Sequence, residues 1–393
     1  MKTMKWKFYS LAFVAGMSIL TPCSSDDNND NDGNGGNGNG NEIENGTILK
    51  GTITSDVTLA AGNTYKLSGE YIVEEGATLH IEEGVKIIAV YDDIADYILV
   101  KQGGKINAVG TPDKPIVMTS EKEEPGAWGG IHICGRAHTN AEGGKGSSEI
   151  GGAVYGGNDD ADNSGTLQYI RLEYTGFAFD EEHEANGISF YGVGNGTIVD
   201  HCQAYKGSDD GFEFFGGSVN VSNLVAVSCS DDSFDWTEGW NGKGTNLVAY
   251  QEAESTLGYD CDCLMECDNN GSNNAATPVA HPVLKNLILV GNGGSKQGIR
   301  LRAGTEVEID NAKVCGKGQP LTVETALTEN ALKNGTSKLT NITLTSELSC
   351  KEGIYTHADF IAVTSNKVDA NLSYSSFEDI KKECSWMNGS WVK

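Results

Sequence analysis

Asp209-Asp210-Gly211-Phe212-Glu213-Phe214 returns one repeat later as Asp231-Asp232-Ser233-Phe234-Asp235-Trp236. Each copy is followed by a second alternating segment, Asn223-Leu224-Val225-Ala226-Val227 and then Asn246-Leu247-Val248-Ala249-Tyr250. Two short strands per unit of 22 to 25 residues, with insertions in the longer units, are typical of stacked coils whose strands form parallel sheets. The sequence therefore predicts an all-β fold, a right-handed parallel β-helix, with a short C-terminal helical or irregular cap.

The same pattern extends in both directions along the chain. The Asn-led segment recurs at Asn286, Asn311 and Asn341, which predicts a ladder of side-chain amides at one corner of the coils. In each strand the residues that flank an outward position point into the core. The inward columns are expected to be Phe190, Phe214, Trp236 and Leu301 on one sheet and Leu224, Leu247 and Leu287 on another.

Composition excludes several other classes of protein. The chain has 393 residues and a formal net charge of -27, from 28 Lys+Arg against 55 Asp+Glu, which argues against a nucleic-acid-binding surface. The 51 glycines show no three-residue period, so collagen is excluded, and so much glycine disfavours a helical bundle. Two of the four arginines, Arg300 and Arg302, stand together.

The N-terminus resembles a targeting segment. Three lysines precede the apolar run 8–20, which predicts a signal peptide over residues 1–22. The following Leu20-Thr21-Pro22-Cys23 resembles a lipobox, with Cys23 as the lipidated residue, and ordinary cleavage with secretion is the alternative. The acidic residues after Cys23 resemble the export signal of surface lipoproteins in Bacteroidota, which implies the outer face of the outer membrane. Residues 23–47, rich in Asn, Asp and Gly, are expected to form a flexible tether.

The β-helix is predicted over residues 48–345 and the cap over 346–393. Residues 375–378 match a capping box that would open a helix running to Cys384, and a Cys350–Cys384 disulfide would hold this element over the last coil. Cys261, Cys263 and Cys267 lack the second ligand pair of a zinc site, so a disulfide among them is expected. Cys202 falls in an inward column and is expected to be a buried thiol.

The motif order resembles that of a group of β-helix proteins exported by Bacteroidota and related bacteria, a group with no established common activity. The resemblance covers roughly residues 48–345, and it rests on the segments 76–87, 103–106, 113–116, 128–131, 155–158, 164–167 and 209–213. More remotely, the fold resembles pectate lyases and other polysaccharide-active β-helices. That resemblance implies a sugar in an outer groove, Ca²⁺ bridging acidic residues, and a Lys or Arg base, although fold alone does not give function.

The outward positions suggest where such chemistry would lie. One outward column runs Ser189, Glu213, Asp235, Glu266, Arg300, and the next runs Tyr191, Phe215, Thr237, Asp268, Arg302. At the preceding corner Asp209 and Asp210 stack over Asp231 and Asp232, with Asp262 beyond. Carboxylates about 4.8 Å apart repel each other, so such a row needs a cation, raised pKa values or an arginine neighbour.

We therefore predict candidate roles for these residues. The corner aspartates and Asp235 would hold Ca²⁺, Glu213, Asp235 and Glu266 would contact a ligand, and Arg300 and Arg302 would clamp its carboxylate. Tyr191, Phe215 and Trp240 would be stacking platforms, and Arg300 is the candidate catalytic base. The alternative is structural: the aspartates cap backbone amides and the column is a solvated face.

Three classes of function remain open. The first is a non-catalytic surface module that binds a polysaccharide or a host or cell-surface glycan, or acts as an adhesin. The second is a Ca²⁺-dependent polysaccharide lyase or glycoside hydrolase acting on an acidic polysaccharide, and the third is a purely structural protein. No nucleic acid partner is expected, membrane contact would run through the lipid alone, and the chain is expected to be a monomer with no cofactor other than Ca²⁺.

Overall fold

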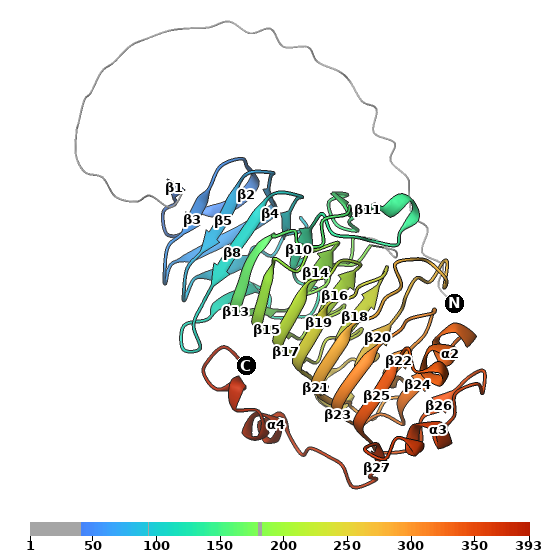
Figure 1. The fold of residues 1–393 in the computed structure, drawn as a ribbon. Helices are drawn as coiled ribbons and strands as arrows, with labels where there is room; N and C mark the ends of the chain where they lie inside the picture. Colours follow the sequence, from blue (N-terminus) through green and yellow to red (C-terminus); the bar gives the residue numbers. More distant parts are fainter. Residues whose placement is uncertain (1–40, 93, 180–182) are drawn as a thin grey trace, which may run out of the picture. The chain divides into compact units, whose positions relative to one another are not determined.

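The computed structural model describes residues 41–92, 94–179 and 183–393, so the predicted signal peptide and Cys23 lie outside the described residues. Parallel strands stack coil upon coil along this part of the chain (Figure 1). The fold is a right-handed parallel β-helix, as predicted. Its coils present three faces, numbered here in the order in which the chain passes them.

Each face is a stack of parallel strands in register. Face one consists of β1 (Asn41–Glu42), β3 (Val57–Leu59), β5 (Thr78–Ile81), β8 (Lys105–Val109) and the first halves of β13 (Gly165–Glu173), β15 (Ile198–Tyr205), β17 (Asn220–Val227), β19 (Lys243–Tyr250), β21 (Val283–Val290), β23 (Glu308–Cys315) and β25 (Lys338–Leu344). Face two consists of the first halves of β2 (Ile48–Ile53) and β4 (Thr64–Val73), β6 (Lys86–Ala89), β9 (Ile116–Ser120), the second halves of the long strands from β13 to β25, and β27 (Lys367–Val368). Face three consists of the second halves of β2 and β4, β7 (Tyr97–Val100), β10 (Ile131–Cys134), β14 (Ile188–Tyr191), β16 (Phe212–Phe215), β18 (Phe234–Thr237), β20 (Met265–Cys267), β22 (Gln297–Leu301), β24 (Gln319–Val323) and β26 (Ser349–Cys350).

Elements outside the three faces are short. An antiparallel hairpin, β11 (Gly146–Ser147) and β12 (Val154–Tyr155), follows a 3-10 turn, η1 (Glu142–Gly144). The helices are α1 (Glu254–Leu257), α2 (Ala326–Asn334), α3 (His357–Ala362) and α4 (Phe377–Glu383), with a second 3-10 turn, η2 (Ser385–Met387).

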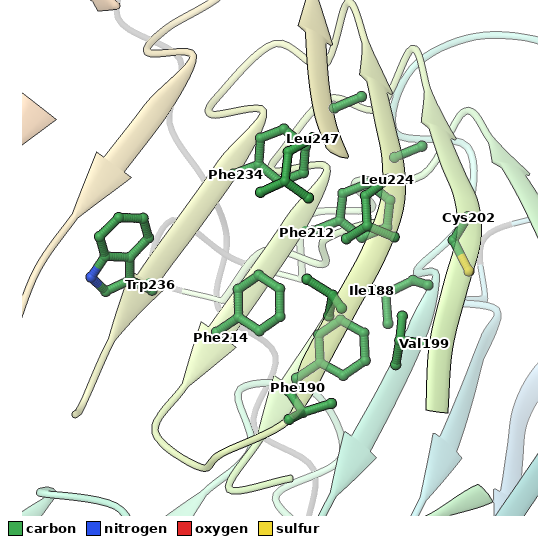
Figure 2. Packing of buried hydrophobic residues seen from close by; sticks show 14 of the residues in the cluster. Ile188, Phe190, Val199, Cys202, Phe212, Phe214, Leu224, Phe234, Trp236 and Leu247 are labelled. Carbon is green, nitrogen blue, oxygen red and sulfur yellow. The ribbon is translucent and has the colours of Figure 1, made fainter. Parts of the chain in front are cut away.

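The core is built from the predicted inward columns. Phe190 pairs in register with Phe214, and Phe214 with Trp236, and all three are buried (Figure 2). The Phe190 and Phe214 rings stack with centroids 5.0 Å apart. Stacked aromatic rings bury large apolar areas between coils, so each coil is stabilised chiefly by its neighbours.

The corner between faces one and two is a single residue in the left-handed backbone conformation. In β13 and β15 it is Tyr169 and His201, and in the long strands that follow it is Asn223, Asn246, Asn286, Asn311 and Asn341. Asparagine tolerates this conformation better than most residues. The predicted ladder is confirmed from Asn223 to Asn311: each of Asn246, Asn286 and Asn311 donates a side-chain N–H to the amide oxygen of the preceding Asn, over 2.8, 3.0 and 2.9 Å. Asn341 does not extend it, because its side-chain N–H is donated to Asp310 Oδ1 at 2.6 Å.

The last coils are covered by α2 and α3 rather than by α4. Leu332 of α2 and Phe360 of α3 join the main core. The helix predicted to end near Cys384 exists as α4, but Ser376 is its N-cap and no capping box forms. The prediction that this helix closes the last coil is wrong.

The residues from about 371 to 393, called the strap below, instead lie along the outer side of face two. Ile380, Met387 and Trp391 of the strap pack in one cluster with outward valines of β17 and β19, such as Val225 and Val248. Ser390 N donates to Pro112 O at 2.8 Å, which brings the strap back to one of the first coils. These outward residues are apolar because the strap covers them.

The structure also corrects the predicted extent of the tether and the predicted disulfides. Within the described residues the first strand is β1, where Asn41 pairs with Val57, so this strand lies inside the segment predicted as a tether. The cysteines of the described residues are all free thiols, and Cys384 packs in the strap cluster while Cys350 lies on the last coil of face three. The predicted Cys350–Cys384 disulfide and the disulfide among Cys261, Cys263 and Cys267 are therefore not formed, whereas Cys202 is buried as expected.

Candidate functional site

The outward column of face three has the register that the sequence predicted. Glu213 lies between Ser189 and Asp235 on neighbouring strands, and Glu266 lies between Asp235 and Arg300. The alternation of side chains along a strand therefore brings these polar groups to one surface.

The corner before this column has a structural role as well. Asn186 Oδ1 accepts a hydrogen bond from Asp210 N at 3.2 Å, Asp210 Oδ1 accepts one from Asp232 N at 2.8 Å, and Asp232 Oδ1 accepts one from Cys263 N at 2.6 Å. Each side chain thus caps a backbone amide of the next coil, as the structural alternative predicted. One oxygen of each aspartate is used in this way.

Corner and column together line a cleft of about 330 Å³, called the acidic cleft below. Among the described residues its lining comprises ten carboxylates, one amide and one guanidinium: Glu149, Glu184, Asp209, Asp210, Glu213, Asp231, Asp232, Asp235, Asp262, Glu266, Asn186 and Arg300. Such a lining attracts cations and repels anions.

The carboxylates come close enough to share a cation. Four overlapping sets each place three possible ligand atoms within 4.8 Å of one another: Asp209, Asp210 and Asp231; Asp210, Glu213 and Asp235; Asp232, Asp235 and Glu266; and Asp232, Asp262 and Cys263. Asp235 belongs to two of these sets, and its Oδ1 is buried without a hydrogen-bond partner. Three of the four sets consist of carboxylate oxygens alone, which suit Ca²⁺, whereas the thiol of Cys263 in the fourth set is a poor ligand for that ion.

Burial and mutual repulsion raise the pKa values of these carboxyl groups, so they are weaker acids than usual. Burial, followed by the neighbouring Asp231, raises the pKa of Asp209 to about 7, and burial raises the pKa of Glu149 to about 7 and that of Asp231 to about 6. The pKa values of Asp210, Glu213, Asp232 and Asp235 are raised well above the ordinary range by burial and by the carboxylates beside them. Without a cation the cleft therefore holds protons near neutral pH.

We expect the cation-free protein to lose stability as the pH rises from about 4 through 7. A raised pKa means that the folded chain holds a proton that the unfolded chain releases, so the stabilisation is complete below the ordinary pKa and is lost as the pH passes the raised values of about 6 and 7. Melting temperatures in EDTA across this range test the expectation. Asp210→Asn, which keeps the capping oxygen, should flatten the decline, and a wild-type melting temperature that climbs between pH 5 and 8 would contradict it.

The two arginines are engaged by the protein itself. Arg300 Nη1 lies 2.7 Å from Glu266 Oε2 and its Nε lies 3.4 Å from Glu324 Oε1, while Arg302 pairs with Glu266 and, at 2.7 Å, with Asp268 Oδ1. Burial opposes the charge of Arg300, but its hydrogen bonds to Glu324 and Glu266 outweigh that effect and raise its pKa above the usual value. This arrangement argues against Arg300 as a base and leaves neither arginine open as an anion clamp.

The predicted stacking platforms are covered. Tyr191 and Phe215 are 1% and 8% exposed, and they pack beneath the β11–β12 hairpin with Tyr155 and Ile150. Trp240 is 1% exposed, stacks on Phe214 at 4.1 Å and donates its indole N–H to Val219 O. All three belong to packed clusters, so the prediction that they face a ligand is wrong.

Three lining residues were not predicted. Asn186 precedes its strand at the position that Asp210 and Asp232 hold in later coils, so the repeat could have identified it. Glu149 and Glu184 lie in the long connections before β13 and β14, where no pattern repeats. Only the folded chain brings those two carboxylates to the cleft.

Comparison with protein families shows which family this chain is related to. A family model described as "Pectate-lyase like beta helix domain" matches residues 51–393, which include every strand of the cleft and the strap. The chain belongs to this pectate-lyase-like β-helix family. Comparisons with curated proteins and with solved structures give no match.

Membership in the pectate-lyase-like β-helix family supports a carbohydrate-related role. The family match ends at the last residue, so the strap is part of the matched domain rather than an appended segment. Within the described ranges, no helix has the length and apolar character needed to cross a bilayer.

Proposed function

We propose that the acidic cleft binds Ca²⁺ and, through it, the carboxylates of an acidic glycan, without cleaving it. The observation that carries this proposal is the convergence of three overlapping sets of carboxylates, each with its ligand atoms within 4.8 Å of one another, in one cleft. The protein would be a lipoprotein anchored through Cys23 to the outer face of the outer membrane of a bacterium such as those of the Bacteroidota. It would act there as a glycan receptor or adhesin.

A cation is needed because the other means of holding an acidic sugar are already occupied. Tyr191, Phe215 and Trp240 are covered, and Arg300 and Arg302 bind Glu266, Asp268 and Glu324. A uronic acid would be repelled by the bare carboxylates. Ca²⁺ would displace the protons of the cleft, neutralise its charge and keep coordination positions for the ligand.

We expect Ca²⁺ to bind the wild-type protein and to raise its melting temperature, with a larger rise at pH 8 than at pH 5 because fewer protons then compete. Asp235→Asn should weaken binding at least about tenfold, since Asp235 takes part in two ligand sets and caps no backbone amide. Isothermal titration of the chelator-treated proteins with CaCl₂ measures binding by the wild type and the variant, and thermal melts measure the rise in melting temperature. Asp113→Asn, which removes an exposed carboxylate on another coil, is the matched control.

Glycan binding is tested separately with polygalacturonate as the probe. Retention of the protein on immobilised polygalacturonate should require Ca²⁺, and EDTA or Asp235→Asn should abolish it. Calcium titrations that show no heat and no shift in melting temperature would refute the cation site. Calcium binding without retention would refute the ligand class alone.

The alternative is a Ca²⁺-dependent lyase or glycoside hydrolase acting on an acidic polysaccharide. It is favoured by the carboxyls that keep protons near neutral pH, because a general acid needs a raised pKa beside a second carboxylate. The same polygalacturonate incubation decides between the two. New reducing ends or an ultraviolet-absorbing unsaturated product, lost in Asp235→Asn, would establish the enzyme.

A further inference from the structure

A second cavity lies between the strap and the amide ladder at the corner of faces one and two, whereas the acidic cleft lies on face three. It has a volume of about 300 Å³, within the range of small-molecule sites. This cavity is called the strap pocket below. Residues of the ladder, of β21 and β23 and of the strap line it: Asn246, Asn286, Leu287, Ile288, Asn311, Lys313, Glu383, Cys384 and Trp386.

The ladder gives this pocket a row of fixed, partly satisfied amides. Asn286 donates one N–H to Asn246 and accepts one hydrogen bond from Asn311, which leaves a second N–H and a second lone pair on its amide. Asn286 and Asn311 are exposed, and their rungs repeat at the spacing of neighbouring strands, about 4.8 Å. Side-chain amides both donate and accept hydrogen bonds, and they therefore suit the hydroxyl groups of a ligand, which also do both.

The strap pocket has no unbalanced charge. Lys313 and Glu383 are paired with each other, and Tyr374 donates to Glu383 at 2.8 Å. Burial raises the pKa of the Cys384 thiol to about 11, so it stays neutral. A neutral ligand is therefore favoured here, in contrast to the acidic cleft.

Trp386 supplies an aromatic wall. Its side chain is half-buried, and its ring lies 6.2 Å from that of the buried Trp391 and 6.4 Å from that of His201, which hold it in place. An indole face packs well against apolar C–H groups. The pocket thus combines one apolar wall with a row of two-way hydrogen-bonding groups.

We propose that the strap pocket binds one neutral pyranose unit of a glycan. Trp386 covers the C–H face of the ring, and the amides of Asn246, Asn286 and Asn311 bind its hydroxyls. This site needs no cation and stands independently of the acidic cleft. A chain carrying both sites would hold neutral and acidic sugars at different places on its surface.

The test is a titration of the full-length protein with glucose, galactose, mannose and N-acetylglucosamine at millimolar concentrations, followed by tryptophan fluorescence and by NMR saturation transfer from the protein to the sugar. At least one sugar should bind. Trp386→Ala should weaken binding about tenfold or more, Trp386→Phe should retain most of it, and Asn311→Ser should weaken it several-fold.

Controls separate this site from the proposed function. EDTA and Asp235→Asn should leave sugar binding unchanged, and Trp386→Ala should leave calcium binding unchanged. Adenosine tests a competing class, because a nucleobase also stacks on indole and binds amides. Binding of adenosine but of no sugar, binding of none of the probes, or sugar binding that Trp386→Ala does not alter while its melting temperature is retained would each overturn the proposal.

Discussion

Glu329→Ala should destabilise the C-terminal end of the β-helix by roughly 3 kcal/mol or more. Glu329, on α2, is fully buried, and its carboxylate accepts backbone hydrogen bonds from Glu352 at 2.7 Å, Ile354 at 2.6 Å and Tyr355 at 3.1 Å. Each buried donor left without a partner costs about 1–3 kcal/mol. Chemical denaturation measures the loss, and amide hydrogen exchange should locate it at residues 352–355.

Two variants make this result specific. Glu329→Gln keeps an acceptor oxygen and should lose distinctly less stability than Glu329→Ala. Leu327→Ala, on the same helix but 48% exposed, should change the free energy of unfolding by no more than about 0.5 kcal/mol. Equal losses in Glu329→Ala and Leu327→Ala would show that the carboxylate does not hold the end of the solenoid.

Trp391→Ala should release the strap and cost about 3–5 kcal/mol. Trp391 is fully buried, and its ring lies 5.2 Å from that of His201 and 6.0 Å from that of Tyr169, both at the corner between faces one and two. Removing it uncovers the apolar surface that includes Val225 and Val248. Thermal melts measure the loss of stability, and limited proteolysis should cut the variant first between about residues 371 and 393.

The indole nitrogen provides a control for this prediction. Trp391 Nε1 is buried and has no hydrogen-bond partner, so Trp391→Phe removes no hydrogen bond and should cost much less than Trp391→Ala. A Trp391→Ala protein that melts with the wild type and resists the protease equally would mean that the strap contributes little to folding.

The solenoid could be predicted because its rules are local. Alternation along a strand fixes which side chains point inward, and the left-handed corner selects asparagine, so Phe214, Trp236 and Asn246 fall where the pattern places them. The acidic column follows from the same register, since Glu213 and Asp235 must lie on adjacent strands.

The segment that covers an outward position can come from a distant part of the chain, so the local pattern does not predict it. The alternation predicts that Tyr191 and Phe215 face outward, but a hairpin from another part of the chain covers them. The strap likewise covers Val225 and Val248, and the run of apolar residues at those outward positions was the signal for it. The carboxylates of Glu149 and Glu184 reach the cleft through long connections whose path the repeat does not determine.

The strap also changes how this protein should respond to force. Coils of a solenoid touch only their neighbours, so tension on one end would ordinarily release them one after another. Here Arg171 Nη1 donates to Ser390 O at 2.7 Å and Lys313 pairs with Glu383, so the strap spans many coils. A pull on the C-terminus loads that long contact first and leaves the coils beneath it folded, which makes the strap a mechanical latch for a protein proposed to hold its ligand at a cell surface.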